Sequence, residues 1–181
     1  LIGSCKEFGC RFTYEVQEDP NGLAQAFVIG KNFICTDSVA LILGDNLFED
    51  NFAPESSSFT NGGKVFAKQV PDPNRFGVVE FDDKFNVLSI EEKPEKPKSN
   101  YIVPGLYFYD NDVIKIAKSI KPSDRGELEI TSINNEYLIA NKLKVEILDK
   151  DVAWFDAGTF ENLKKASDYM YKIKKLKSIN I

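Results

Sequence analysis

The chain contains no histidine among its 181 residues. This absence excludes acid–base catalysis by imidazole, and zinc sites of the His₂ or His₃ type, from these residues. The three cysteines, Cys5, Cys10 and Cys35, do not have the spacing of a zinc site. Their odd number fits reduced thiols in a cytoplasmic protein better than a set of disulfides. Any catalysis here therefore depends on carboxylates, lysine, arginine and a bound metal.

Long apolar segments and concentrated basic charge are also lacking. The apolar runs reach five or six residues at most, whereas about 20 are needed to cross a bilayer, so we expect no membrane interaction. The net charge is −5 and no basic stripe compensates for it, which argues against nucleic acid as a partner. With 43% hydrophobic residues the chain can bury one substantial core, and we expect a single domain over residues 1–181.

Apolar patterns typical of strands alternate with patterns typical of helices. The five apolar residues of 39–43 predict a strand that is covered on both faces, as in a parallel sheet flanked by helices. We therefore predict an α/β fold with a mixed, mostly parallel sheet flanked by helices. Strands are predicted at 12–16, 39–43, 64–70, 77–81, 87–92, 101–109, 144–148 and 154–156, and helices at 23–33, 112–120, 127–140 and 159–175.

Two of these predicted strands end on an aspartate. Asp45 follows the apolar run and Gly44, and Asp156 ends the short segment that begins at Trp154, 111 positions further along the chain. Open α/β sheets bind ligands at the carboxyl ends of their strands, so the two carboxylates could meet and hold one divalent cation. Either aspartate could instead cap a turn or a helix, and Asp156 lies close to Thr159, a good helix N-cap.

Seven short motifs occur in an order that resembles the sugar-1-phosphate nucleotidylyltransferases. Each motif is weak alone, but their common order over about residues 12–169 is specific. The resemblance implies an incomplete Rossmann-like nucleotidyltransferase fold. The motifs are Gly22-Leu-Ala-Gln-Ala26, Leu43-Gly-Asp-Asn46, Arg75-Phe-Gly-Val-Val79, Glu92-Lys-Pro94, Gly105-Leu-Tyr-Phe-Tyr-Asp110, Arg125-Gly-Glu-Leu-Glu-Ile-Thr131 and Trp154-Phe-Asp-Ala-Gly-Thr159.

The resemblance also implies a reaction. Members of the family join a sugar 1-phosphate to the α-phosphorus of a nucleoside triphosphate, with Mg²⁺ as cofactor, and release pyrophosphate. The motifs that begin at Gly22 and Arg125 favour dTTP as the nucleotide. The likeness is greatest to family members that use glucose 1-phosphate, so the expected product is dTDP-glucose. UTP, CTP or another sugar is an alternative, and so is a non-catalytic module that binds sugar nucleotides. Relatives are commonly homo-oligomers, so we expect the same of the intact enzyme.

Roles for individual residues follow from the resemblance alone. Asp45 and Asp156 match the metal-binding aspartates and would be catalytic, and Asp45 would also contact the nucleotide. Solvated side chains, core packing for Tyr107 and an ordinary Asn-Gly turn at Gly22 are the structural alternatives. The sugar-phosphate residues would be Gly77, Glu92, Lys93, Val103, Tyr107 and Arg125, with Lys93 also catalytic, and the base-reading residues would be Gln17 and Gly22.

One family motif has no counterpart. The family's opening strand carries a glycine-rich loop of the form G-G-x-G-T-R-x-x-P, which holds the triphosphate, and no Gly-x-Gly-Thr-Arg string occurs in these residues. We therefore expect that the opening strands of the fold are absent from the chain. On that expectation, the 181 residues alone would have little or no activity.

Overall fold

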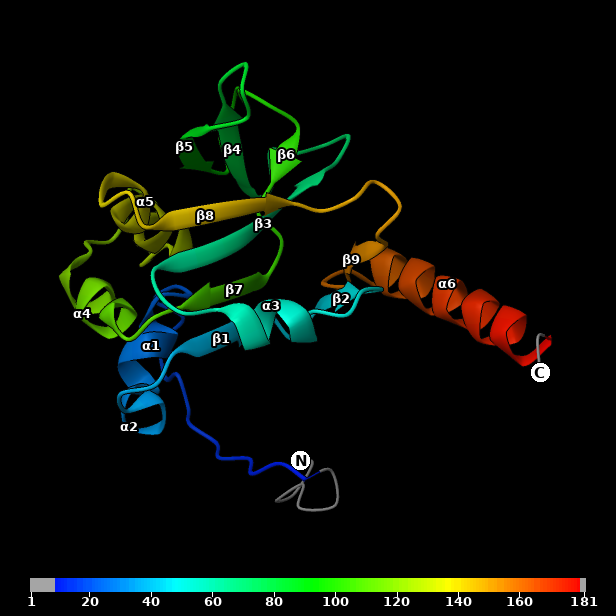
Figure 1. Ribbon diagram of the computed structural model, residues 1–181, viewed down its shortest axis with the longest axis horizontal. Coiled ribbons are helices and arrows are strands. Elements are labelled where there is room, and N and C mark those ends of the chain that lie inside the picture. Colours follow the sequence, from blue (N-terminus) through cyan, green and yellow to red (C-terminus); the bar gives the residue numbers. More distant parts are fainter. Residues whose placement is uncertain (1–8, 180–181) are drawn as a thin grey trace.

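A seven-stranded sheet forms the centre of the computed structural model, which describes residues 9–179. A separate two-stranded ribbon lies beside this sheet (Figure 1). The sheet follows the order β1 (Val39–Ile42), β7 (Leu106–Tyr109), β3 (Gly63–Gln69), β6 (Tyr101–Ile102), β4 (Gly77–Phe81) and β5 (Val87–Glu92), with β8 (Leu143–Ile147) also paired to β3. The ribbon consists of β2 (Asn46–Phe48) and β9 (Trp154–Asp156).

The α/β fold is confirmed, but the prediction of a mostly parallel sheet is wrong. Within the described residues only β3 and β8 pair in parallel, and the other pairings are antiparallel. The error came from treating an apolar run as a sign of strand direction. All four residues of β7 are buried, yet β7 is antiparallel to both of its neighbours. A continuous apolar run reports that both faces are covered, and it does not report which way the next strand runs.

Alternate residues of the central strands point into two separate cores. Val65 and Ala67 of β3 belong to a core with α1 (Gln25–Ile29), α4 (Asp112–Ser119) and α5 (Ile130–Ile139). In Figure 1 these three helices lie together on one side of the sheet. The predicted helix 23–33 divides at Gly30 into α1 and the short helix α2 (Lys31–Ile34).

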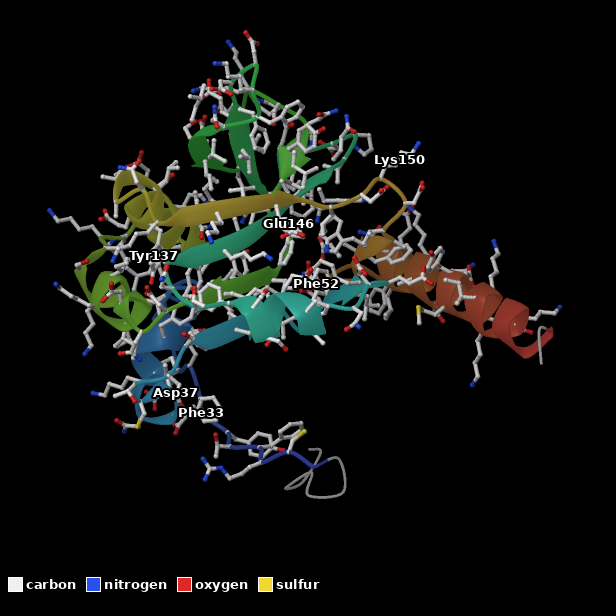
Figure 2. All side chains as sticks on the ribbon, in the orientation of Figure 1. Phe33, Asp37, Phe52, Tyr137, Glu146 and Lys150 are labelled. Carbon is white, nitrogen blue, oxygen red and sulfur yellow. The ribbon has the colours of Figure 1, made fainter. Side chains whose placement is uncertain are left out.

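The second core lies on the opposite face, because Phe66 of β3 points away from Val65 and Ala67. Phe66 packs there against Phe108, and Phe52 and Phe59, which flank α3 (Ala53–Ser58), pack against this core. Phe52, labelled in Figure 2, lies just before α3, with its ring centroid 5.0 Å from that of Phe66. The sheet therefore has both faces covered, although its strands are mostly antiparallel.

Helix α6 (Phe160–Ile179) follows the ribbon and projects away from the sheet (Figure 1). Its predicted N-cap is confirmed, since Thr159 Oγ1 accepts a hydrogen bond from the backbone N–H of Asn162 at 3.2 Å. The Phe155 and Tyr169 rings pack at 5.1 Å between centroids and attach the helix to β9. None of the helices described in residues 9–179 is both long enough and apolar enough to span a membrane.

Several predicted elements differ from those observed. Residues 12–16 form no strand, because no strand in the described part of the chain pairs with them. The predicted strand 101–109 divides at Pro104 into β6, which pairs with β3 and β4, and β7, which pairs with β1 and β3. Helix α5 begins at Ile130, three residues later than predicted. Residues 49–63, for which no helix or strand is predicted, contain α3. Cys5 lies outside the described residues.

Candidate active site

The ribbon of β2 and β9 brings the two predicted metal-binding aspartates together. Asn46 pairs with Asp156 across the ribbon, and the Ala157 N–H donates to the Asp45 carbonyl at 2.7 Å. A Cβ added at Gly158 would lie 3.1 Å from Oδ1 of Asp156 and 3.1 Å from Oδ2 of Asp45. The two carboxylates therefore face one point, and the absence of a side chain at Gly158 leaves room for both.

These donors fit a hard divalent cation such as Mg²⁺. Such a cation prefers oxygen ligands and is commonly held by one or two carboxylates together with phosphate oxygens and water. Among residues 9–179 no group of three or more His, Cys, Asp or Glu side chains could hold a metal. Asp45 and Asp156 could therefore supply two oxygen ligands to such a cation.

Asn46 holds the Asp45 carboxylate in place, a role that the sequence analysis missed. Its Nδ2 donates to Oδ1 of Asp45 at 2.9 Å, while its Oδ1 accepts from Trp154 Nε1 at 2.7 Å and from the Gly105 N–H at 3.0 Å. The Asn46 side chain is buried. Because Oδ1 of Asp45 is occupied by this amide, Oδ2 is the oxygen that faces Asp156.

The hairpin of β4 and β5 supplies Lys93 and Glu92. Gly77 pairs with Glu92, and the Lys93 N–H donates to the Phe76 carbonyl at 3.0 Å. Lys93 has a φ of 43°, a left-handed conformation that is uncommon for residues other than glycine. Strained backbone of this kind is found at functional sites more often than elsewhere. The turn ends the strand and leaves the Lys93 side chain at the cavity that is described next.

A cavity of about 340 Å³ unites most of the predicted site residues. This volume lies within the range of small-molecule sites. Tyr107, which the sequence left open between pocket wall and core, serves as both, since it lines the cavity and is only 3% exposed. Burial raises the pKa of the Tyr107 hydroxyl, and the nearby Glu92 carboxylate raises it further. The predicted residues that line the cavity are Asp45, Gly77, Glu92, Lys93, Val103, Tyr107 and Asp156.

Glu92 is a buried carboxylate at the wall of this cavity. Thr131 Oγ1 donates to its Oε2 at 2.5 Å. Burial raises the pKa of Glu92 above its ordinary value, while the Thr131 hydrogen bond lowers it, Glu129 raises it, and Lys93 and Arg125 lower it. A Cβ at Gly77 would lie 3.0 Å from Thr131 Oγ1, so the glycine leaves space for this carboxylate–hydroxyl pair.

Arg125 does not line the cavity. Its guanidinium bonds to Glu127 Oε1 at 2.9 Å and lies 3.4 Å from Glu129 Oε1 and 3.9 Å from Glu92 Oε1. Three carboxylates therefore surround the group that the resemblance assigns to the sugar phosphate. In this arrangement Arg125 lies beside Glu92, which does line the cavity.

Gln17 and Gly22 lie together but also outside the cavity lining. Gln17 Nε2 donates to the Gly22 carbonyl at 3.1 Å and to Gln25 Oε1 at 2.6 Å. Gly22 has a φ of 107°, and a Cβ there would lie 2.6 Å from the backbone nitrogen of Leu128. Gly22 is thus required by a close approach of two backbone segments. Its neighbour Leu23 does line the cavity.

Arg75 and Thr131 also line the cavity and were given no role by the sequence analysis. Both occur inside motifs on which the family resemblance rests, as does Asn46. That membership was the available sign of their importance. Trp154 packs on Phe76 at 5.4 Å between ring centroids. It also lines the cavity and donates to Asn46.

Comparison with known proteins identifies the class of the chain. Residues 1–172 match the family model described as nucleotidyl transferase. The chain belongs to this family, and the resemblance drawn from its motifs is confirmed.

Several curated relatives of the chain are named glucose-1-phosphate thymidylyltransferase. The protein from Neisseria gonorrhoeae is 48% identical over 185 residues, which cover 100% of this chain and 64% of the relative. The protein from Mycobacterium tuberculosis (strain H37Rv) is 47% identical over 187 residues, with 100% of this chain and 64% of the relative covered. The chain therefore spans about 64% of the length of these relatives.

Solved structures agree with this assignment. A Bacillus anthracis protein described as a glucose-1-phosphate thymidylyltransferase, solved in complex with sucrose, matches with a TM-score of 0.84 and 43% identity over 93% of this chain and 68% of that one. A UDP-glucose pyrophosphorylase in complex with UDP-glucose matches with a TM-score of 0.76 over 90% of this chain and 67% of that one. Its identity is 24%, so this second likeness shows the fold alone.

Proposed function

We propose that the cavity is the sugar-phosphate and cation site of a Mg²⁺-dependent thymidylyltransferase. The reaction joins glucose 1-phosphate to the thymidylyl group of dTTP and yields dTDP-glucose and pyrophosphate. The observation that carries the proposal is the convergence of Asp45 and Asp156 on one point in the cavity that Lys93 and Glu92 also line. Family membership and the names of the relatives provide further support.

Each side chain has a task that its chemistry suits. Lys93 is a compact positive charge that binds the phosphate of glucose 1-phosphate. Glu92, when ionised, accepts hydrogen bonds from sugar hydroxyls, and Thr131 fixes its orientation. Asp45 and Asp156 hold the cation, which when bound neutralises charge on the phosphate oxygens. Two anions must approach each other in this reaction, so positioning and charge neutralisation account for most of the catalysis.

Product binding tests this proposal directly on the 181-residue chain. We expect dTDP-glucose to bind in isothermal titration calorimetry in the presence of Mg²⁺, and Asp45→Asn or Asp156→Asn to weaken that binding about 10-fold or more, because each removes a ligand charge. Asp83→Asn is the matched control, since Asp83 is exposed in the turn between β4 and β5. Absence of binding in the presence of Mg²⁺ would contradict the proposal.

The same titration separates the alternatives. Binding that does not depend on the metal would favour a non-catalytic module, because such a module needs no pair of metal ligands. Tighter binding of UDP-glucose or CDP-glucose than of dTDP-glucose would favour another nucleotide. Turnover is a separate question. Because no Gly-x-Gly-Thr-Arg string occurs in these residues, we expect the chain to bind product but to release pyrophosphate very slowly from dTTP and glucose 1-phosphate.

The proposal includes a cytoplasmic, homo-oligomeric enzyme. Support for the location comes from the exposed thiol of Cys35 and from an odd number of cysteines. Support for oligomerisation comes from the family resemblance. Sedimentation velocity on the purified protein would test it, and a species of monomer mass at micromolar concentration would contradict it.

A further inference from the structure

Arg75 extends into the cavity from the segment that joins β3 to β4. Its Nη2 lies 3.8 Å from Oδ2 of Asp156, and its Cζ lies 5.9 Å from the centroid of the Phe76 ring. The Arg75 side chain is 57% exposed and lines the same cavity as Lys93 and Asp156. Arg75 thus has an aromatic face on one side and an open cavity beside it.

The backbone of the β4–β5 hairpin brings the side chains of Arg75 and Lys93 to the same end of the hairpin. The Phe76 carbonyl accepts from the Lys93 N–H at 3.0 Å, and the Phe76 N–H donates to the Pro73 carbonyl at 3.1 Å. The Phe76 ring is held in turn against Trp154. Arg75 and Lys93 therefore come from rigid, directly bonded segments, and their positive charges face one cavity.

The guanidinium of Arg75 has unused hydrogen-bonding capacity. A separation of 3.8 Å from Asp156 exceeds a hydrogen bond, and among residues 9–179 this carboxylate is the only charged group of opposite sign within 4 Å of the guanidinium. A guanidinium carries five N–H donors in a planar fork that matches phosphate oxygens. Arg125 differs in both respects, because three carboxylates surround it and it does not line the cavity.

We propose that Arg75 is a phosphate-binding residue of this cavity and acts beside Lys93. The inference rests on the proposed function, since it assumes that phosphorylated substrates occupy the cavity. Its guanidinium donates to oxygens of a phosphate monoester or of a diphosphate. When Arg75 binds phosphate it leaves the Asp156 carboxylate, and Oδ2 of Asp156 then becomes available to the cation, while Oδ1 keeps its hydrogen bond from the Gly158 N–H. The sugar phosphate and the diphosphate of a nucleotide are two sources of the same chemistry.

Binding measurements on five versions of the 181-residue chain test the inference. We would titrate glucose 1-phosphate, inorganic pyrophosphate and uncharged methyl glucoside into the wild type, Arg75→Gln, Arg75→Lys, Lys93→Gln and the control Lys84→Gln. Lys84 is an exposed cation in the turn at the other end of the same hairpin. We expect Arg75→Gln to weaken phosphate binding about 10- to 100-fold, as loss of a charge-assisted hydrogen bond does. Arg75→Lys should recover part of this loss, because lysine keeps the charge but lacks the fork.

Each outcome bears on the inference. Weaker binding of glucose 1-phosphate with unchanged methyl glucoside affinity supports a contact to the sugar phosphate. Weaker binding of pyrophosphate alone supports a contact to the nucleotide. Unchanged affinities in Arg75→Gln, together with a loss in Lys93→Gln, would overturn the role of Arg75 and leave the proposed function intact. If the wild-type chain binds neither phosphate compound, the proposed function fails and this inference fails with it.

Discussion

Replacement of Asn46 by leucine is the most informative single change to this site. Leucine branches at the same carbon as asparagine and is not smaller, so Asn46→Leu removes the polar contacts of the amide without opening a cavity. Three hydrogen bonds disappear. Asn46 Nδ2 no longer donates to Asp45, and Asn46 Oδ1 no longer accepts from Trp154 Nε1 or from the Gly105 N–H. The Gly105 N–H is buried, and in the variant it would have no acceptor in the leucine side chain.

The expected loss of stability follows from these contacts. A neutral hydrogen bond contributes about 1 kcal/mol net, and a buried donor that loses its acceptor costs about 1–3 kcal/mol. The bond to Asp45 adds little because that carboxylate is exposed. We therefore expect Asn46→Leu to lower the free energy of unfolding by about 2–4 kcal/mol. The Asp45 rotamer would no longer be held, so affinity for a divalent cation should fall about 10- to 100-fold.

Two measurements check this prediction. Urea unfolding, followed by circular dichroism, gives the change in stability, and titration with Mn²⁺ followed by electron paramagnetic resonance gives the cation affinity. Asn61→Leu is the control, because Asn61 is an exposed asparagine, and it should change stability by no more than about 0.5 kcal/mol. The reasoning would be refuted if Asn46→Leu matched the wild type in both measurements.

Three further changes have defined consequences. Burial raises the pKa of Glu92 above its ordinary value of 4.5, so the folded chain holds this proton more tightly than the unfolded chain does. As the pH rises through the raised pKa, the buried group ionises and the chain loses stability. Glu92→Gln should therefore raise the melting temperature at pH 7 more than at pH 4, and equal shifts would contradict this. Lys93→Gly should raise the free energy of unfolding by about 1 kcal/mol, since glycine adopts a positive φ without strain. Calorimetry with glucose 1-phosphate should show a loss of binding in the same variant. A lower free energy of unfolding would argue against strain at Lys93. A Cβ at Gly105 would lie 2.7 Å from Cγ of Leu43, so Gly105→Ala should cost about 1–3 kcal/mol in urea unfolding, and a neutral result would show that this segment shifts freely.

Local elements of the fold could be predicted because their determinants are local. The hairpin of β4 and β5 follows from two short apolar segments joined by a polar turn, and its predicted bounds agree with those observed. The N-terminus of α6 follows from Thr159, whose hydroxyl makes the expected hydrogen bond. Strand direction could not be predicted, because it depends on pairings between distant segments such as β1 with β7.

Residues of the candidate site could likewise be predicted only where their signal is local in the sequence. Asp45 and Asp156 could be singled out because each carboxylate ends an apolar strand, and the structure brings them together. Asn46 and Thr131 could not be singled out, since their roles consist of contacts with residues far away in the chain. Arg125 is the opposite case, in which a residue was singled out but its side chain has other partners. Its motif matches the family, but nearby carboxylates occupy its guanidinium, and no sequence pattern reports that competition.

The ribbon that carries both aspartates joins strands of only three residues each, from segments about a hundred positions apart. A two-stranded pairing of this size has little stability of its own, so it is among the parts of a molecule that open most readily. A cation or phosphate that binds only the closed ribbon stabilises it by mass action. Substrate arrival would then complete the local folding of the site, and the amide protons of Leu47 and Ala157 would exchange with deuterium more slowly once ligand is bound.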